Sequence, residues 1–378
     1  MTEVRLPAEL RVVIDGDAGL TSAALDALDP FPAREPGDAP EGQYAGGLVI
    51  RSATAGGADR FHELQLLAGD GHVTGHDGEQ LWVLDGAAGC SVPSLGRTDE
   101  MAMTIEAGFP VARAFRSVIR PWLQLAVVER GGVAIHASCV EVDGRAVLVA
   151  GWSESGKTET ALALMERGAS FISDKWTLVT PGRRAAAFPI GVGVRGWVLR
   201  YLPILRGQLP FAARAQLRLA AAGKVLTSPF ERWHGGGRLR RLATDVALRS
   251  VALADRAALR PSDVRRVYGD RADPAREIPI ALVAVLRTRP GTLIDVADGE
   301  LDRLSRRLAA SAFAERGEFM ALQQRAAYAE ARAFDAAALV EGDRRALRQL
   351  LDGTPVVEVS APFPTDPRRV ADALMAAL

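Results

Sequence analysis

The sequence predicts an α/β protein in which strands and helices alternate, preceded by a β-rich region. Three observations support this class. The apolar run of residues 146–150 is followed by a glycine-containing loop and then by a helical pattern over residues 157–167. The apolar run of residues 278–286 has the length and continuity of a strand buried on both faces. Between and after these runs, extended and helical patterns alternate, which is typical of an α/β core.

The composition favours a globular protein without a nucleic-acid or membrane partner. The chain has 378 residues, of which 48% are hydrophobic and 24% are charged, so it can bury a core and is long enough for two domains. Lys plus Arg (46) equals Asp plus Glu (46), which gives a formal net charge of zero. A neutral chain lacks the positive field that draws proteins to nucleic acids and anionic membranes.

The cysteines and the N-terminus indicate a soluble, cytoplasmic protein. The two cysteines, Cys90 and Cys139, make neither a disulfide framework nor a four-cysteine zinc site. The first ten residues lack the basic start and apolar run of a secretory signal. No apolar stretch approaches the roughly 20 residues that span a bilayer.

Residues 1–110 are expected to form a small β-rich N-terminal domain, a candidate for substrate docking. Short apolar runs alternate with turns rich in glycine and aspartate, which favours an antiparallel sheet. These runs are residues 10–14, 48–50, 61–67 and 81–84.

Residues 111–378 are expected to form the second domain. Its first segment, residues 111–130, has helical spacing and contains Pro121, so we expect a kink or two abutting helices. Further strands and helices follow from apolar runs and periodicity. The strands are residues 133–135, 146–150, 171–172, 278–286 and 356–359, and the helices are residues 157–167 and 301–334.

Residues 151–158, Gly-Trp-Ser-Glu-Ser-Gly-Lys-Thr, fit the Walker A pattern G-x-x-x-x-G-K-[ST] without a mismatch. In such a P-loop, glycines let backbone N–H groups face phosphate oxygens, and the next helix adds its positive dipole end. Lys157 would reach the β- and γ-phosphates, and the Thr158 hydroxyl would bind Mg²⁺. The sequence therefore predicts a site for a nucleoside triphosphate and Mg²⁺, and the loop alone leaves ATPase, GTPase and kinase open. The candidate nucleotide-binding residues are Gly151, Ser153, Glu154, Ser155, Gly156, Lys157, Thr158 and Glu159.

Three acidic residues near the loop allow more than one interpretation. Asp174 follows the short strand after the predicted helix, where a carboxylate could bind Mg²⁺ or take the proton of an attacking hydroxyl. The alternative is a surface aspartate that caps a turn. Glu159 could hold a water molecule on the metal ion, or it could be an ordinary acidic residue near a helix N-terminus. Glu154 would place negative charge near the phosphates.

The segment from Gly151 to Asp174 resembles the catalytic domain of HPr kinase/phosphorylase almost position by position. His136 matches the histidine that precedes the loop in that family, and Arg195 matches the arginine of a later Glu-Ile-Arg-Gly element. The resemblance implies a P-loop, HPr-kinase-like (PEP-carboxykinase-like) core. It also implies ATP- and Mg²⁺-dependent transfer of the γ-phosphoryl group to a hydroxyl, favouring a serine of a peptide or small protein. Some HPr-kinase-like proteins phosphorylate a serine of a lasso-peptide precursor.

The resemblance also implies roles for individual residues. Lys157 and Asp174 would be catalytic, with His136 and Arg195 as supporting residues near the transferred group. Thr158 and Asp174 would be the metal ligands. Because the family often forms oligomers, a homo-oligomer is a further expectation.

Two positions depart from the family pattern. Lys175 stands where the family often has a second acid, and Gly193 stands where it has the glutamate of the later element. Fewer carboxylates would hold a second cation less well, whereas Lys175 could neutralise phosphate directly. A small-molecule (amino acid or sugar) kinase and a non-catalytic nucleotide-binding or peptide-recognition protein therefore stay open. So do the choice of ATP or GTP and the phosphorylase reaction. Finally, residues 233–241 are predicted to form a basic, glycine-rich loop that could cover a ligand.

Overall fold

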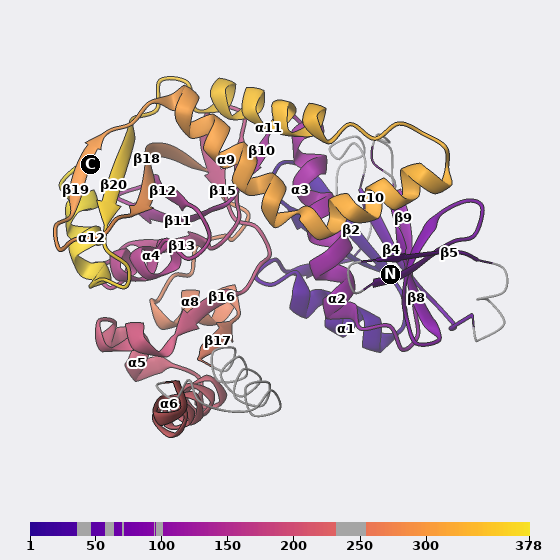
Figure 1. Ribbon diagram of the computed structural model, residues 1–378, viewed down its shortest axis with the longest axis horizontal. Helices are drawn as coiled ribbons and strands as arrows, with labels where there is room; N and C mark the ends of the chain where they lie inside the picture. The colour runs from indigo at the N-terminus through magenta and orange to yellow at the C-terminus, as the bar shows by residue number, and fades with distance from the viewer. Residues whose placement is uncertain (36–46, 57–63, 70–71, 94, 96–100, 232–254) are drawn as a thin grey trace.

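Two large β-sheets, covered by helices, make up the part of the chain that the computed structural model describes (Figure 1). The described residues are 1–35, 47–56, 64–69, 72–93, 95, 101–231 and 255–378. The predicted basic loop at residues 233–241 lies outside them. None of the helices in these ranges has both the length and the apolar character needed to cross a membrane.

The N-terminal sheet has nine strands in the order β3-β1-β2-β4-β9-β8-β7-β6-β5. The prediction that it is antiparallel is wrong in its middle, where β2, β4 and β9 run parallel to one another. A helix, α1 (Ala18–Ala27), connects β2 to β3, and β4 follows beside β2. The strands are β1 (Thr2–Leu6), β2 (Leu10–Asp15), β3 (Ala33–Arg34), β4 (Leu48–Ala53), β5 (Gln65–Gly69), β6 (His72–His76), β7 (Leu81–Asp85), β8 (Ala88–Val92) and β9 (Met101–Glu106).

Helix α1, which the strand patterns did not predict, has local sequence signals of its own. The Asp17 side chain caps the helix by accepting a hydrogen bond from the backbone N–H of Leu20 at 2.8 Å. Leu20 and Ala24, one helical turn apart, are both buried. The helix therefore covers one face of the N-terminal sheet and makes the parallel connection sterically possible.

The helical segment after the first sheet is interrupted as predicted, but not by a simple kink. It consists of α2 (Val111–Ala114), a π-helical turn η2 (Phe115–Ile119) and α3 (Arg120–Glu129). The Arg120 N–H donates to the Phe115 carbonyl, five residues back. Pro121 has no N–H to donate and its ring obstructs the carbonyl four residues back, so the wider turn just before it accommodates the proline. Apolar residues of this segment and of both sheets belong to one continuous core.

The second sheet has the strand order β10-β14-β15-β18-β12-β11-β13, with β20 also paired to β18 and β19 paired to β20. Strands β12, β18 and β20 are parallel, whereas β11 and β12 form a hairpin. Asp143 and Gly144 form the predicted turn of this hairpin, both with positive φ. The strands are β10 (Val133–Ile135), β11 (Ala137–Val142), β12 (Arg145–Gly151), β13 (Ser170–Ser173), β14 (Thr177–Thr180), β15 (Arg184–Ala186), β18 (Ile278–Thr288), β19 (Asp295–Asp298) and β20 (Val356–Ala361).

Strand β12 is buried on both faces. Of the run that the sequence predicted to be buried on both faces, residues 282–286 of β18 are buried, whereas residues 279–281 are not. Leu148 packs into the core that also contains residues of α9 (Leu301–Glu315), whereas Val147 and Val149 pack into a second core with residues of α4 (Lys157–Met165) and α12 (Pro367–Met375). The predicted helix 301–334 is two helices, α9 and α10 (Gly317–Ala329), which meet at Arg316. Helix α11 (Ala336–Leu350) packs beside α9 (Figure 1).

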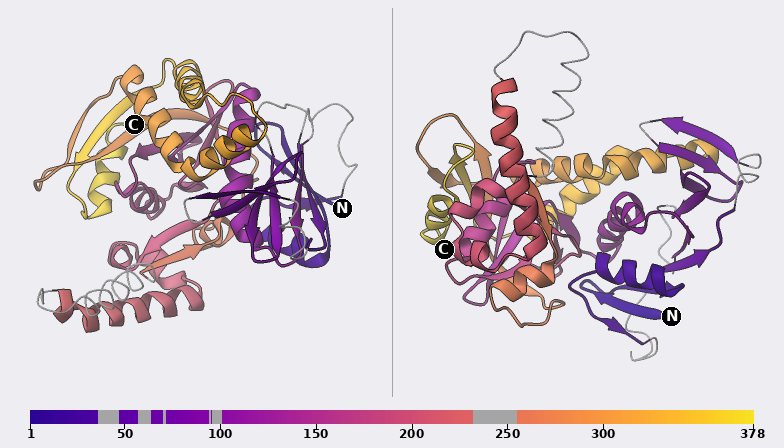
Figure 2. Two further views of the ribbon diagram at one scale, coloured as in Figure 1. Left: turned by 45° about the vertical axis from the view of Figure 1, so that its right-hand side comes forward. Right: turned by 90° about the horizontal axis from the view of Figure 1, so that it is seen from below.

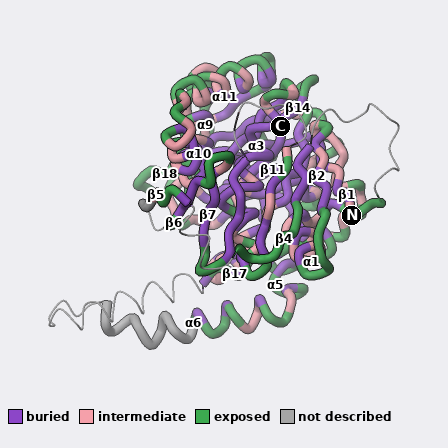
Figure 3. Tube along the Cα trace, turned by 90° about the vertical axis from the view of Figure 1, so that its right-hand side faces the viewer, coloured by how far each residue is buried: buried purple, intermediate pink, exposed green. Residues whose placement is uncertain are grey.

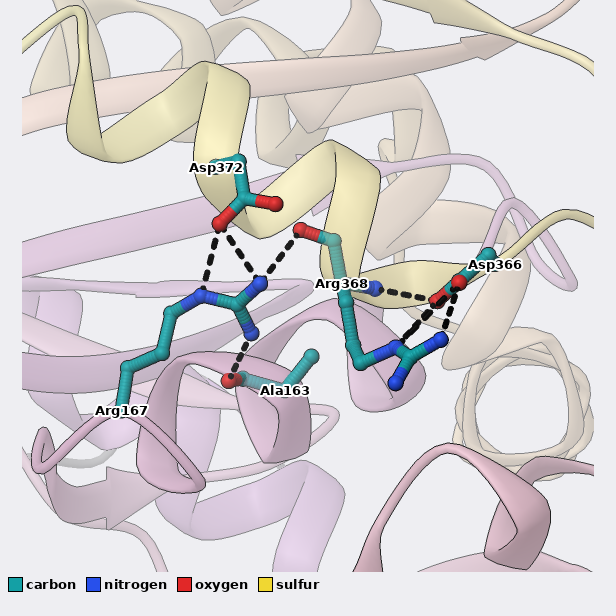
Figure 4. Close-up of polar contacts among 5 residues, drawn as sticks. All are labelled: Ala163, Arg167, Asp366, Arg368 and Asp372. Carbon is teal, nitrogen blue, oxygen red and sulfur yellow. Dashed lines mark hydrogen bonds and ion pairs between the residues drawn. The ribbon is translucent and has the colours of Figure 1, made fainter.

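Helix α12 is attached to α4, the helix that begins at the candidate phosphate-binding loop (Figure 4). Arg167, just after α4, donates from Nε and Nη2 to Asp372 Oδ1 at 2.8 and 2.6 Å. The same guanidinium also donates to the carbonyls of Ala163 and Arg368. Asp366 caps α12 and bonds the Arg368 side chain. These contacts connect α12 to the C-terminal end of α4.

A smaller unit projects from the second sheet on the side of the candidate loop. It contains the two-stranded sheet of β16 (Val192–Arg195) and β17 (Arg256–Leu259), together with η3 (Gly196–Arg200), α5 (Pro203–Gln208), α6 (Phe211–Glu231) and α8 (Pro261–Val267). Helix α6 extends away from the body of the molecule (Figures 2 and 3). The two-stranded sheet matters for the site because both Arg195 and Arg256 lie on it.

Candidate phosphate-binding site

The loop between β12 and α4 adopts a conformation that depends on glycine at its first position. Gly151 has φ 152°, and a Cβ atom there would lie 2.8 Å from the Leu286 carbonyl oxygen of β18 and 2.5 Å from Ser155 Oγ. A side chain at residue 151 would therefore collide with the neighbouring parallel strand. Gly156, at the N-cap of α4, has φ 93°, which also favours glycine. The backbone thus meets the steric requirement that the sequence pattern predicted.

Lys157 lies across this loop. Its side chain is only 6% exposed, and Nζ donates to the carbonyl oxygens of Gly151 at 3.0 Å and Trp152 at 2.8 Å. Burial lowers the pKa of Lys157 to about 8, although the nearby Asp174 carboxylate acts in the opposite direction. An ammonium group held by two neutral carbonyls lacks a full counter-charge, so a phosphate would be a better partner.

Asp174 joins the segment after β13 to the start of α4. It is 1% exposed, and its Oδ1 accepts hydrogen bonds from Thr158 Oγ1 at 2.8 Å and from Ser138 Oγ at 2.5 Å. Ser138 lies on β11, the strand between β12 and β13. A surface aspartate that caps a turn, the alternative considered from the sequence, is wrong because this carboxylate is buried against two hydroxyls.

The Thr158 hydroxyl and the Asp174 carboxylate are suitable ligands for Mg²⁺, which prefers oxygen donors. The described residues contain no group of three or more His, Cys, Asp or Glu side chains able to hold a metal ion. A Mg²⁺ site built on Thr158 and Asp174 would therefore need oxygens from phosphates and water, which is how Mg²⁺ is commonly bound with nucleotides. The donor set fits a metal ion that arrives with its nucleotide.

His136, between β10 and β11, is a buried and neutral imidazole. It is 3% exposed, its Nδ1 lies 2.8 Å from Ser311 Oγ on α9, and its ring centroid is 5.6 Å from that of Trp176. Burial, together with the positive charges of Lys157 and Lys175, lowers its pKa to about 3. The Glu315 carboxylate, 3.8 Å from Nε2, therefore does not form an ion pair with it at neutral pH. His136 can donate or accept one hydrogen bond in the pocket without adding charge.

The remaining predicted residues, Glu154, Glu159 and Arg195, surround the loop. Glu154 has positive φ and is 67% exposed, and its carboxylate is paired with the Arg195 guanidinium. The negative charge that Glu154 places near the phosphates is therefore balanced by a cation from β16. Glu159 is 9% exposed and burial raises its pKa, so it is not an ordinary surface acid of a first helical turn.

One pocket brings together most of the predicted residues with several that the sequence did not indicate. Gly151 and Asp174 lie next to the pocket, through their hydrogen bonds to Lys157 and Thr158. Arg256 and Glu315 reach the pocket from β17 and α9, but no motif surrounds either residue in the sequence. The pocket is lined by His136, Ser153, Glu154, Ser155, Gly156, Lys157, Thr158, Glu159, Lys175, Gly193, Arg195, Arg256 and Glu315.

Comparison with known proteins gives one partial match. Over 82 residues the chain is 33% identical to HPr kinase/phosphorylase of Lachnoclostridium phytofermentans. The chain is similar to this kinase in part. The matched region covers 20% of this chain and 26% of that protein, so the chain spans about a quarter of its relative. No protein-family model matches the chain. The similarity supports an HPr-kinase-like relationship and favours a kinase among the nucleotide-binding classes that the loop pattern leaves open.

Proposed function

We propose that the protein is a kinase that transfers the γ-phosphoryl group of ATP, with Mg²⁺, to a serine hydroxyl of a peptide or small protein. The observation that carries this proposal is the buried Asp174 carboxylate, hydrogen-bonded to Thr158 at the start of α4. It is supported by the steric need for Gly151, the buried Lys157 ammonium and the partial similarity to a named kinase.

The residues of the pocket divide into those that would hold the nucleotide and those that would act on the acceptor. The loop N–H groups, the N-terminus of α4 and Lys157 would bind the phosphates. Thr158 and Asp174 would hold the Mg²⁺ ion, which would offset negative charge on the β- and γ-phosphates. Arg195 would leave Glu154 for a phosphate oxygen, because a phosphate carries more charge than a carboxylate.

Asp174 is also the candidate base. In the reaction, the bond between the γ-phosphorus and the oxygen that bridges it to the β-phosphate breaks. A new bond forms between that phosphorus and the serine oxygen, and the hydroxyl proton passes to a carboxylate. Asp174 already accepts hydrogen bonds from two hydroxyls, so a third hydroxyl from a substrate would replace one of them. The neutral His136 could donate a hydrogen bond to the oxygen of the incoming hydroxyl and orient it.

A peptide or protein acceptor is proposed from the similarity and not from the pocket. The relative's name describes a kinase of HPr, and we extend to this chain a peptide or protein acceptor without identifying it as HPr. The side chain of Trp152, the second residue of the loop, is 62% exposed and could contact a macromolecular acceptor. We also propose that the protein works in the cytoplasm, where ATP is available.

Intact-mass measurement of serine-containing peptides, incubated with the protein, ATP and Mg²⁺, tests the proposal. The wild type should add one phosphate, and Lys157→Ala and Asp174→Asn should not. An Asp143→Asn variant, in the exposed β11–β12 turn, is the matched control and should behave as the wild type. If small hydroxyl compounds are phosphorylated and peptides are not, the acceptor is a small molecule and not a peptide. Nucleotide binding without turnover on any acceptor would refute the kinase proposal.

A further inference from the structure

Arg256 occupies the space that a side chain at residue 193 would need. Its strand, β17, pairs with β16 so that Arg256 lies opposite Arg195 and diagonally from Gly193. A Cβ atom on Gly193 would lie 2.6 Å from both Cζ and Nη2 of Arg256. The guanidinium therefore lies flat over the glycine and contributes to the lining of the pocket. A larger residue at 193 would displace it.

Lys175 reaches the same pocket from a strained backbone position. It has φ 60°, a conformation that costs a non-glycine residue about 1 kcal/mol or more. It directly follows Asp174, so its backbone is fixed beside the carboxylate that bonds Thr158. Lys175 and Arg256 both line this pocket, so the two cations face the same space.

The other two cations of the pocket already have partners, whereas these two do not. Lys157 is bonded to two carbonyls and Arg195 to Glu154. Within the described part of the chain, neither the Lys175 nor the Arg256 side chain makes a hydrogen bond or an ion pair. Carboxylates lie near both cations: Asp174 and Glu315 act on Lys175, and Glu159 interacts with Arg256. Because none of these carboxylates is hydrogen-bonded or ion-paired to either side chain in the described residues, both cations can still contact an anion placed between them.

We propose that Arg256 and Lys175 form an anion-binding position for the γ-phosphoryl group, and that Gly193 is required because it leaves room for the Arg256 guanidinium. This inference rests on the proposed function. The γ-phosphate is the favoured anion because Lys175 is adjacent to Asp174, at the Thr158 end of the loop. The loop amides would hold the phosphates nearer the nucleoside, and Lys157 would reach the β- and γ-phosphates from the opposite side of the γ-phosphoryl group.

The proposed position would stabilise the group during transfer. The γ-phosphorus separates from the leaving ADP while its bond to the acceptor oxygen forms, and the hydroxyl proton passes to Asp174. Negative charge stays on its three equatorial oxygens throughout. Guanidinium and ammonium groups fixed beside these oxygens would stabilise that charge without help from a second metal ion.

Equilibrium binding of Mg²⁺·ADP and of Mg²⁺ with the β,γ-imido analogue of ATP, measured by calorimetry, tests this inference. The variants are Arg256→Ala, Lys175→Ala and Gly193→Ala. Arg266→Ala is the control, because Arg266 is 71% exposed and pairs with Asp263 on α8. Each of the three should weaken binding of the triphosphate analogue about tenfold or more, since charge-assisted hydrogen bonds are lost. ADP binding should stay within about twofold of the wild type, which also reports that the variant is folded.

The outcomes separate this inference from the proposed function. If the wild type binds both nucleotides and Arg256→Ala behaves as Arg266→Ala, the inference is wrong while the proposed function stands. Equal weakening of ADP and triphosphate binding would also overturn it, because the contact would then not be to the γ-phosphate. A wild type that binds neither nucleotide overturns both. Arg256→Lys, which keeps a cation, should recover part of the lost selectivity for the triphosphate.

Discussion

The Thr158 hydroxyl lies 2.8 Å from Asp174 Oδ1 and 3.1 Å from Oδ2, although 16 residues separate the two in the chain. Helix α4 and strand β13 bring them together, and Ser138 of β11 holds the same carboxylate from the other side. A buried carboxylate that accepts hydrogen bonds from two hydroxyls has a fixed orientation. It is therefore ready for a metal ion at Thr158 or for the proton of a third hydroxyl.

Asp174→Asn should remove phosphoryl transfer and leave the fold intact. The amide has the same shape, but it neither takes a proton nor supplies a charge to a metal ion, so the rate should fall by about 10²-fold or more. The amide oxygen can still accept from Thr158 and Ser138. Phosphopeptide formation should be measured together with the far-ultraviolet circular dichroism spectrum. A variant that keeps more than a tenth of wild-type activity would contradict the assigned role.

Lys157→Met should abolish the stabilisation of the protein by nucleotide without destabilising the free protein strongly. Its ammonium is buried and its pKa is lowered to about 8, so the folded state is penalised by that charge. Methionine fills a similar space without a positive charge. In thermal unfolding, Mg²⁺·ATP at 100 times its Kd should stabilise the wild type by about 2.7 kcal/mol and the variant not at all. Equal stabilisation of both proteins by Mg²⁺·ATP would show that Lys157 does not contact the nucleotide.

The loop, its flanking strand and helix, and Asp174 could be predicted from the sequence because each has a local signal. Glycines at Gly151 and Gly156, the apolar run before them and the short spacing to Asp174 are all contained in about 30 consecutive residues. Gly156 lines the pocket, and Gly151 and Asp174 lie next to it through hydrogen bonds to Lys157 and Thr158. Their catalytic roles stay predictions.

Contacts between distant segments could not be read from the sequence. Arg256 reaches the pocket only because β17 pairs with β16, and Ser311 meets His136 only because α9 packs on the second sheet. The parallel pairing of β2, β4 and β9 was missed for a related reason. Short apolar runs do not encode strand direction. The helix α1, which permits the parallel connection, was not predicted either.

Gly151→Ala should destabilise the protein more than Gly144→Ala. Both glycines have positive φ, but a Cβ at residue 151 would also lie 2.8 Å from the Leu286 carbonyl, whereas at Gly144 nothing lies within 4 Å. We expect a loss of about 2–4 kcal/mol for Gly151→Ala and of about 1 kcal/mol for Gly144→Ala. Urea unfolding gives both values. Equal losses would mean that the loop shifts to accommodate the methyl group.

His136 should make the protein less stable in acid. Burial lowers its pKa from the ordinary value of 6.5 to about 3. Between these values the unfolded chain binds a proton that the folded chain does not, so the free energy of unfolding falls as pH falls. Each pH unit in this window corresponds to about 1.4 kcal/mol. His136→Asn should reduce the difference in unfolding free energy between pH 6.5 and pH 5 by roughly 2 kcal/mol. If the free energy of unfolding changes with pH in the same way in both proteins, His136 makes no such contribution.

Glu154→Gln should tighten nucleotide binding. In the free protein the Glu154 carboxylate holds Arg195, and Glu154 is 67% exposed, so the pair is worth at most about 1 kcal/mol. Removing the charge frees Arg195 and removes repulsion of the phosphates, so the Kd for Mg²⁺·ATP should fall about two- to fivefold at low salt. Because the pair is exposed, the gain should shrink in 1 M salt. Glu341→Gln, which breaks an exposed pair with Arg344 outside the pocket, should leave the Kd unchanged. Weaker binding by Glu154→Gln would instead mean that this carboxylate keeps Arg195 positioned for the nucleotide.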